Sequence, residues 1–264
     1  MKVAVTTLAS TVAALLGLGL VMLYSSSMTK VGTHDLFMQL VWVGLGFGLC
    51  VTAALRDYAE LKELRWVLYG GSLVMLLLVF APLIGHGSHG AHRWIGRGHV
   101  TVQPSEFVKI ALIIVLAWYG DRYQRQMPAW IRGVLYPVLL IAPVLALIFR
   151  EPDRGQTILL SSVCLGMLLV AGVRWRCIII PASLALGITL LICLQAAINI
   201  GVVTSALPNK GLPLPFISYG GSNLLAMFTC LGILFSIARQ AEPVVRLAPV
   251  PVVTEENPFT AKTA

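Results

Sequence analysis

Eight apolar stretches separated by polar breaks make up most of this chain. They lie near 6–24, 36–55, 64–84, 104–120, 133–149, 156–173, 177–206 and 221–238. An α-helix needs about 20 apolar residues to cross the hydrocarbon core of a bilayer. The pattern therefore predicts an all-α fold, a polytopic helical bundle of about eight transmembrane helices. The seventh stretch is too long for a straight crossing, so we expect it to bend or to leave the bilayer near Pro181 and Pro208.

Composition supports a membrane protein, since 58% of the residues are hydrophobic and only 11% are charged, against about 25% in soluble domains. Of the 19 Lys and Arg residues, 12 lie at the N-terminus and in the even-numbered connections, against 6 in the odd-numbered ones. This bias predicts that both termini are cytoplasmic. Topology thus explains the net charge of +8, and no basic stripe with interleaved aromatic residues indicates a nucleic-acid partner.

We expect residues 1–239 to form one membrane domain and residues 240–264 to form a disordered cytoplasmic tail. The first apolar stretch is longer than the apolar core of a signal peptide and is predicted to be a retained helix. The loops near 85–103, 150–155 and 207–220 are then predicted to face outward.

The start of the fourth stretch carries the most unusual charges. Pro104 suits the first turn of a helix, and Glu106 lies in the same turn. Lys109 follows three residues later, so it shares a helix face with Glu106 about one turn deeper. Charges at that depth need a partner or a wet cavity. The pair is therefore predicted either to line an outward-facing polar cavity with a functional role or to fix the helix position.

The loop before this helix contains His86, His89 and His92, whose spacing invites a metal interpretation. The intervening glycines argue against a helix that would align them, so solvated loop histidines are the simpler interpretation and no metal site is assigned. Arg93 is a candidate phosphate ligand. Trp94 is either part of the same site or an interfacial anchor.

Three further sets of residues have both a structural and a functional interpretation. Asp153 is predicted to cap the sixth helix, unless it takes part in chemistry, and Glu151 is expected to be solvated or paired with an arginine. Gln195 and Asn199 share a helix face and favour hydrogen bonds between helices over substrate contact. Gly44 and Gly48 form a weak small-residue packing motif.

The segment 212–222 concentrates two prolines, two glycines and three hydroxyl groups in one bend. Its prolines hold the backbone extended. Gly220 and Gly221 permit positive φ and close approach, and Ser222 is placed to cap the next helix. Residues 220–222 are either a capped turn or an anion site at a helix start.

Residues 213–222, Pro-Leu-Pro-Phe-Ile-Ser-Tyr-Gly-Gly-Ser, closely resemble the signature of the SEDS family, the shape, elongation, division and sporulation proteins that include RodA, FtsW and SpoVE. Other segments resemble that family in the same order and cover about residues 10–239. They are 19–26 in the first helix, 93–95 and 103–109 before and in the fourth helix, 151–156 in the loop that follows the fifth, and 195–203.

The resemblance implies a peptidoglycan glycosyltransferase of the bacterial cytoplasmic (inner) membrane, which polymerises lipid II beside a class B penicillin-binding protein. The acceptor hydroxyl needs a base. The departing pyrophosphate needs positive charge from Arg, Lys or a divalent cation such as Mg²⁺ or Mn²⁺. We expect a catalytic group of Glu106, Lys109 and Asp153. The expected substrate contacts are Arg93, Trp94, Gln103, Ser218, Gly220, Gly221 and Ser222.

The chain departs from this family between Val173 and Pro181. Members typically have two more helices there and a large outer loop, whose His-Thr-Asp-Phe-like motif contains the aspartate considered catalytic. No such motif occurs here. Loss of two helices together preserves the topology of both ends, but Glu106, Asp153 or a partner must then supply the base. The alternatives are a non-catalytic scaffold that binds lipid II or a penicillin-binding protein and, third, a lipid II transporter.

Overall fold

The computed structural model describes residues 2–27, 34–80, 85–88, 91–97, 100–123, 126, 131–151, 153–171, 179–207 and 212–241. Within them, one α-helix corresponds to each of the eight predicted apolar stretches. The helices are α1 (Lys2–Ser27), α2 (His34–Leu55), α3 (Glu60–Val79), α4 (Pro104–Tyr123), α5 (Tyr136–Arg150), α6 (Arg154–Ala171), α7 (Ile179–Val203) and α8 (Gly221–Ala241). A π-helical turn, η2 (Ile131–Leu135), leads into α5. The predicted helical bundle is confirmed.

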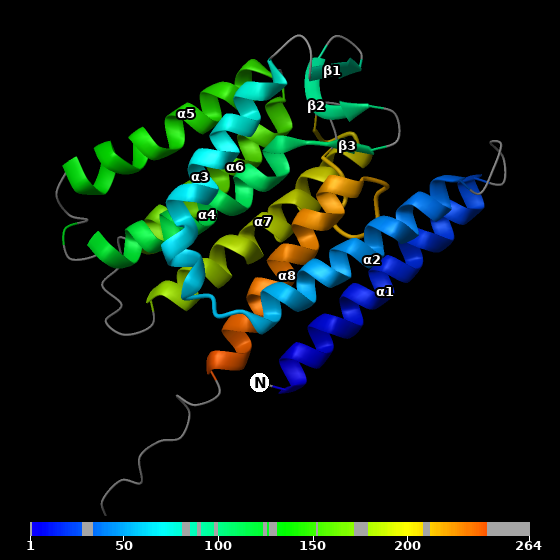
Figure 1. Cartoon of the computed structure of the whole chain (residues 1–264), viewed down its shortest axis with the longest axis horizontal. Helices are drawn as coiled ribbons and strands as arrows, with labels where there is room; N and C mark the ends of the chain where they lie inside the picture. The colour runs from blue at the N-terminus through cyan, green and yellow to red at the C-terminus, as the bar shows by residue number, and fades with distance from the viewer. Residues whose placement is uncertain are drawn as a thin grey trace, which may run out of the picture.

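The helices run roughly alongside one another in an elongated bundle (Figure 1). The start of α1 and the end of α8 lie at the same end of it, as an even number of crossings requires. Among the described residues, six helices are long and apolar enough to cross a membrane, and they lie within α1, α2, η2–α5, α6, α7 and α8. The chain is therefore a multi-pass membrane protein.

The other two helices, α3 and α4, each carry four charged residues. Charged side chains are costly in contact with lipid, so a helix that carries them needs protein around it. Accordingly α4 packs against α3, α5, α6, α7 and α8. Nearly every side chain from Pro104 to Gly120 is buried. The central position of α4 is what allows it to hold charges at the level of the bilayer.

A seam of glycines joins α2 to α8. The contacts follow the same order along both helices, which therefore run parallel: Gly221 against Trp42, Gly46 against Phe228, Gly232 against Cys50, and the Arg239 guanidinium donating to the Leu55 carbonyl at 2.8 Å. The predicted packing residues on α2 were wrong. A Cβ at Gly44 or Gly48 would meet nothing within 4 Å, whereas one at Gly46 would overlap the Phe228 ring.

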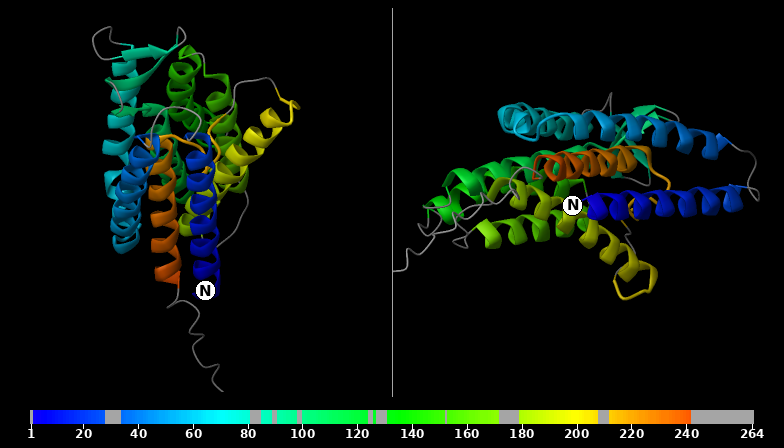
Figure 2. Two further views of the ribbon diagram at one scale, coloured as in Figure 1. Left: turned by 90° about the vertical axis from the view of Figure 1, so that its right-hand side faces the viewer. Right: turned by 90° about the horizontal axis from the view of Figure 1, so that it is seen from below.

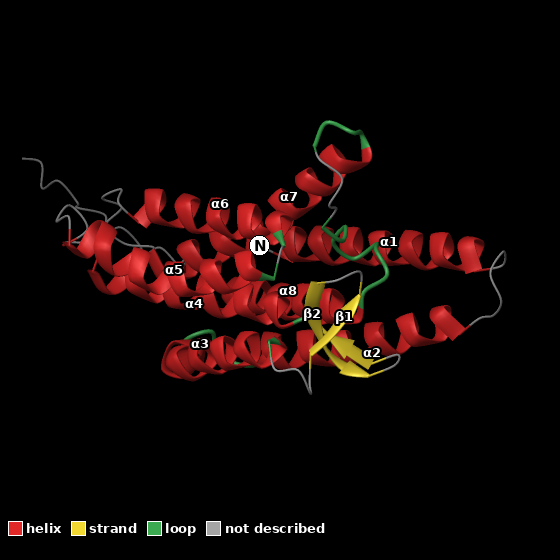
Figure 3. Cartoon of the chain, turned by 90° about the horizontal axis from the view of Figure 1, so that it is seen from above, coloured by secondary structure: helices red, strands yellow, loops and turns green. Residues whose placement is uncertain are grey.

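Three short strands between α3 and α4 were not predicted, because the sequence analysis treated 85–103 as an irregular loop. β1 (Gly85–Ser88), β2 (Ala91–Arg97) and β3 (Val100–Val102) form an antiparallel sheet in the order β1-β2-β3. The sheet contacts α3, α4 and α8 at the end of the bundle away from the N-terminus (Figures 1 and 3). β-branched residues supply much of β3, and such residues favour strands.

The long seventh stretch is accommodated by tilt. α7 is one continuous helix of 25 residues that begins at Ile179, so Pro181 lies in its first turn, where a proline is tolerated. Figure 2 shows α7 inclined to the other helices. A helix longer than the bilayer is thick commonly tilts in this way. Pro208 and residues 242–264, most of the predicted tail, lie outside the described residues.

Candidate functional site

The predicted ion pair between Glu106 and Lys109 is present in the first turns of α4. Lys109 Nζ lies 2.9 Å from Glu106 Oε2, and both side chains are 0% exposed. α4 begins at Pro104 as predicted, and the Glu106 backbone N–H donates to the Gln103 carbonyl at 3.2 Å. The predicted outward-facing cavity is wrong for this conformation, because neither side chain of the pair reaches solvent.

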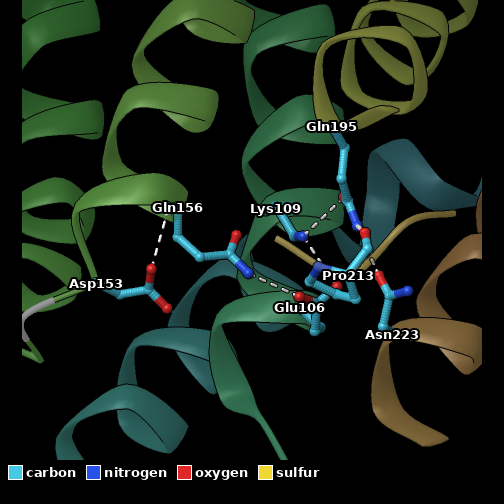
Figure 4. A network of polar contacts seen from close by, with 7 residues as sticks. All are labelled: Glu106, Lys109, Asp153, Gln156, Gln195, Pro213 and Asn223. Atoms are coloured by element: carbon cyan, nitrogen blue, oxygen red, sulfur yellow. Dashed lines mark hydrogen bonds and ion pairs between the residues drawn. The ribbon is translucent and has the colours of Figure 1, made fainter. Parts of the chain in front are cut away.

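Both members of the ion pair have a second partner from another helix (Figure 4). Gln156 Nε2 on α6 donates to Glu106 Oε1 at 2.8 Å, and Lys109 Nζ donates to Gln195 Oε1 on α7 at 3.3 Å. A buried ion pair needs such additional hydrogen bonds to offset the cost of removing two charges from water. The pair therefore fixes α4 against α6 and α7.

Gln195 extends this network to the bend that follows α7. Its Nε2 atom donates to the Pro213 carbonyl and to Asn223 Oδ1, both at 2.9 Å. One turn further along α7, Asn199 Nδ2 donates to the Leu212 carbonyl. The prediction that these amides form hydrogen bonds between elements is confirmed. Five separate segments of the chain thus meet around Glu106 and Lys109.

Asp153 connects to the network through the start of α6. Its Oδ1 atom accepts a hydrogen bond from the Gln156 backbone N–H at 3.2 Å, so the predicted capping role is confirmed. The cap aligns the turn from which the Gln156 side chain reaches Glu106. Of the two expectations for Glu151, solvation was wrong, because that side chain is buried; its pairing with an arginine stays a prediction.

The bend at 212–220 is a compact turn held by its own hydroxyl group. The Leu214 backbone N–H donates to Ser218 Oγ at 2.8 Å, and the Ser218 backbone N–H donates to the Leu214 carbonyl at 3.2 Å. Gly220 and Gly221 do not use the positive φ that glycine permits; within the bend that conformation occurs at Phe216, with φ of 62°. For a bulky residue this conformation is strained by about 1–3 kcal/mol. Packing against Phe228 helps to hold it.

Small residues next to this bend allow close packing on both sides of it. A Cβ at Gly19 of α1 would lie 2.8 Å from the Ile217 carbonyl oxygen, so α1 needs glycine there. Gly221 permits close approach as predicted, because the Trp42 ring lies against it. Ser222 is not the helix cap: α8 begins at Gly221, and Ser222 lies buried in its first turn.

Several buried polar atoms around the ion pair have no hydrogen-bond partner among the described residues. They are Ser105 Oγ, Gln156 Oε1 and Asn223 Nδ2. An unsatisfied buried polar atom costs about 1–3 kcal/mol. Proteins keep such atoms where water or a ligand satisfies them. This region therefore has capacity for an additional polar group next to a carboxylate and an ammonium.

The structure thus brings together only part of the predicted site. Glu106, Lys109 and Gln103 are adjacent, and Asp153 is joined to them through Gln156. Trp94 lies on β2, opposite His86 of β1. The side chain of Arg93, the histidine side chains of the loop and residue 89 lie outside the described residues. Sequence reasoning missed the roles of Gln156 and Asn223, although each is an amide adjoining a recognisable motif.

Comparison with known proteins agrees with this arrangement. A family model described as cell cycle protein, for FtsW, RodA and SpoVE, matches residues 6–184 and 181–243. The probable peptidoglycan glycosyltransferase FtsW of Coxiella burnetii is 27% identical over 86% of this chain and 94% of its own length. FtsW of Pseudomonas fluorescens is 35% identical over 61% of this chain and 41% of its own length.

Solved structures share the fold. RodA, the rod shape determining protein of Thermus thermophilus, superimposes with a TM-score of 0.77 at 24% identity, covering 89% of this chain and 96% of RodA. A chain from a peptidoglycan synthase complex that coordinates polymerization and crosslinking has a TM-score of 0.76 at 22% identity, covering 89% of this chain and 97% of that chain.

The alignments also locate the difference between this chain and its relatives. The two matched stretches of the family model meet at residues 181–184, beside the predicted gap. The Coxiella burnetii alignment spans 350 positions, so more than a hundred residues of that relative have no counterpart in this chain of 264. With the motifs, the helical bundle and the family match in agreement, the chain belongs to the FtsW/RodA/SpoVE family of cell cycle proteins, the SEDS family.

Proposed function

We propose that this protein is a peptidoglycan glycosyltransferase, which polymerises lipid II at the outer face of the bacterial cytoplasmic membrane. The observation that carries the proposal is the Glu106–Lys109 pair, buried where the family's motifs converge and surrounded by polar atoms without partners. Relatives over most of this chain are named as probable peptidoglycan glycosyltransferases, which supports the same activity here.

The residues divide the proposed chemistry between them. Glu106 is the candidate base that accepts the proton of the acceptor hydroxyl, and such a base must come within hydrogen-bond distance of it. Lys109 balances the charge of that carboxylate and lies next to the developing charge of the leaving pyrophosphate. Asp153 aligns Gln156, which orients Glu106. Because the pair is enclosed, substrate entry requires α4, α6 or the 212–220 bend to move.

Further residues are proposed as contacts for the pyrophosphate and for the sugar of the substrate. Arg93 and the helix start at 220–222 are candidates for pyrophosphate, and Trp94, Gln103 and Ser218 are candidates for the sugar. The described residues contain no cluster of three or more His, Cys, Asp or Glu side chains suited to a metal. Any Mg²⁺ or Mn²⁺ in the reaction is proposed to bind the pyrophosphate of the substrate, whose developing charge it would balance.

A specific observation favours a second candidate function. More than a hundred residues of the aligned relative have no counterpart here, and the family model divides into two matches at residues 181–184, beside the interval in which the resemblance places the aspartate considered catalytic. A protein without that segment would keep the hydrogen-bonded residues of the family's motifs as a binding surface but would lack the group that catalyses the reaction. The second candidate is accordingly a non-catalytic scaffold that binds lipid II or a class B penicillin-binding protein. The third, a lipid II transporter, gains no support from the enclosed pair.

The experiment uses the full chain, purified in detergent with its cognate class B penicillin-binding protein, whose transpeptidase is blocked. Labelled lipid II and Mg²⁺ or Mn²⁺ are added, and a moenomycin-type inhibitor silences contaminating class A enzymes. Glu106→Gln is compared with Glu60→Gln, which removes an exposed carboxylate that pairs with Arg56. Size-exclusion profiles check that both variants fold.

The glycosyltransferase proposal predicts glycan polymer from the wild type and from Glu60→Gln, and none from folded Glu106→Gln. Equal activity of Glu106→Gln and the wild type would remove Glu106 from the catalytic role. No polymer from the wild type, with retained binding of lipid II or of the penicillin-binding protein, would establish the scaffold instead. Movement of labelled lipid II between leaflets without polymer would indicate a transporter.

A further inference from the structure

A mainly aromatic region lies at the opposite end of α4 from the ion pair. A pocket of about 350 Å³ is formed there between α3, α4, η2 and α5. Its lining combines aromatic rings, two leucines and one cation: Trp66, Trp118, Tyr119, Tyr123, Arg132, Tyr136, Leu139 and Leu140. We call it the aromatic pocket. The function proposed above uses none of these residues.

Arginines are held in place by the aromatic rings of this pocket. The Arg132 guanidinium lies 5.7 Å from the Tyr123 ring centroid, and Arg65 lies 4.1 Å from that of Trp118. The Tyr119 hydroxyl donates to the Arg132 carbonyl at 2.5 Å and so fixes its backbone. Stacking orients a guanidinium while leaving its N–H donors available.

These positive charges are not neutralised by the surrounding protein. No described residue forms an ion pair with Arg132 or Arg65. Arg65 Nη1 donates to the Lys62 carbonyl, whereas its buried Nε has no hydrogen-bond acceptor among the described residues. The lining of the pocket contains no carboxylate. The exposed Arg132 guanidinium therefore places an unpaired positive charge on the lining of the pocket, where it can bind an anion.

The position of the pocket identifies the source of that anion. It lies at the end of the bundle that the distribution of Lys and Arg assigns to the cytoplasm, where Trp and Tyr occupy the headgroup level of a bilayer. Trp66, Tyr136 and Leu139 remain exposed on the outer wall of the bundle. An apolar, lipid-facing opening beside an unpaired arginine fits a molecule with both acyl chains and a phosphate.

We propose that the aromatic pocket binds an anionic glycerophospholipid of the cytoplasmic leaflet. Arg132 contacts the headgroup phosphate through charge-assisted hydrogen bonds. The aromatic walls and Leu139 pack against the glycerol and the first carbons of an acyl chain. Basic pockets between transmembrane helices on the cytoplasmic side are suited to such headgroups. This inference is independent of the glycosyltransferase proposal.

The test measures lipid retention rather than activity. The full chain is reconstituted in nanodiscs of phosphatidylcholine, with or without phosphatidylglycerol, and bound lipid is counted by native mass spectrometry after detergent release. Arg132→Ala is compared with Arg56→Ala, a matched loss of charge from another exposed arginine at the same end of the bundle that does not line the pocket. A third variant, Leu139→Trp, fills the opening without changing the charge.

We expect Arg132→Ala to reduce retained phosphatidylglycerol about fivefold, the ratio that corresponds to roughly 1 kcal/mol per basic residue near an anionic surface. Leu139→Trp should also reduce it, and Arg56→Ala should not. Equal retention by Arg132→Ala and Arg56→Ala would overturn the proposal. So would displacement of the lipid by soluble glycerol phosphate, because the site would then recognise free phosphate alone.

Discussion

Two regions of this bundle join helices by opposite means. Around α4, the side chains of Glu106, Lys109 and Gln195 join four helices and a bend by hydrogen bonds with defined directions. Between α2 and α8, contact depends on glycines that let a ring or a backbone approach closely. The polar network specifies which groups meet but carries a desolvation cost, whereas the glycine seam gains dispersion contacts and tolerates no added volume. The bend at 212–220 lies between the two regions and contacts both.

The largest effect should come from removing one charge of the ion pair. Glu106→Leu leaves the Lys109 ammonium buried without its counter-charge, which costs about 3–5 kcal/mol. Thermal unfolding in detergent micelles measures the loss. The double variant Glu106→Leu/Lys109→Leu should regain much of it, because no unpaired charge remains. A double variant as unstable as the single one would contradict the description of the pair as mutually compensating.

The next largest effect should come from the glycine seam. In Gly232→Val, added carbons meet the Cys50 backbone and the Ala53 side chain, which cannot move aside as a flexible side chain would. Overpacking of this kind costs about 1–3 kcal/mol. Gly48→Ala is the matched control: its new Cβ meets nothing within 4 Å, and unfolding should be unchanged or slightly harder. Equal destabilisation by both substitutions would show that α2 and α8 do not pack through Gly232.

Removal of Gln195 should have a smaller effect than either. Gln195→Leu abolishes the contacts to Lys109, Pro213 and Asn223 and leaves their polar atoms buried, at a cost of about 1–2 kcal/mol. Limited proteolysis should report easier cleavage in the 212–220 bend, since its main tether to α7 is lost. Thr189→Val serves as the control, because that hydroxyl only bonds the carbonyl of its own helix at Ala185. Unchanged cleavage in Gln195→Leu would argue that the bend is held from α1 and α2 instead.

The smallest effect should appear at the end of the seam where Arg239 meets Leu55. The Ala59 backbone N–H donates to Asp57 Oδ1 at 2.8 Å and, with a hydrogen bond from Gln240, lowers the pKa of that carboxyl. A lowered folded-state pKa gives stability that is present above the unfolded value and is lost as pH falls through the folded one. Asp57→Asn should therefore be slightly less stable than wild type at neutral pH. The difference should shrink as pH falls below about 4, the ordinary pKa of an aspartate, and should vanish once pH is below the lowered folded-state pKa. A difference that persisted there would exclude this carboxylate as its cause.

The sequence predicted the contact within α4 but missed the contacts that join α4 to other helices. The spacing of Glu106 and Lys109 predicted their pairing, because residues three apart on a helix are neighbours. Their second partners are 50 and 86 residues away in sequence, and no local pattern connects them. In the same way, the small-residue motif of α2 pointed to Gly44 and Gly48, whereas the face that meets α8 contains Gly46.

Hydrophobic length, charge bias and motif order thus determined that this chain is an eight-helix membrane protein of its family, since these properties depend only on residue type and local spacing. Tertiary structure alone decided that the ion pair is enclosed and that positive φ falls on Phe216. It also decided that Ser222 lies within α8 and that aromatic residues from three elements surround Arg132. These outcomes depend on which helix faces meet, and that choice is made by the packing of the whole bundle at once.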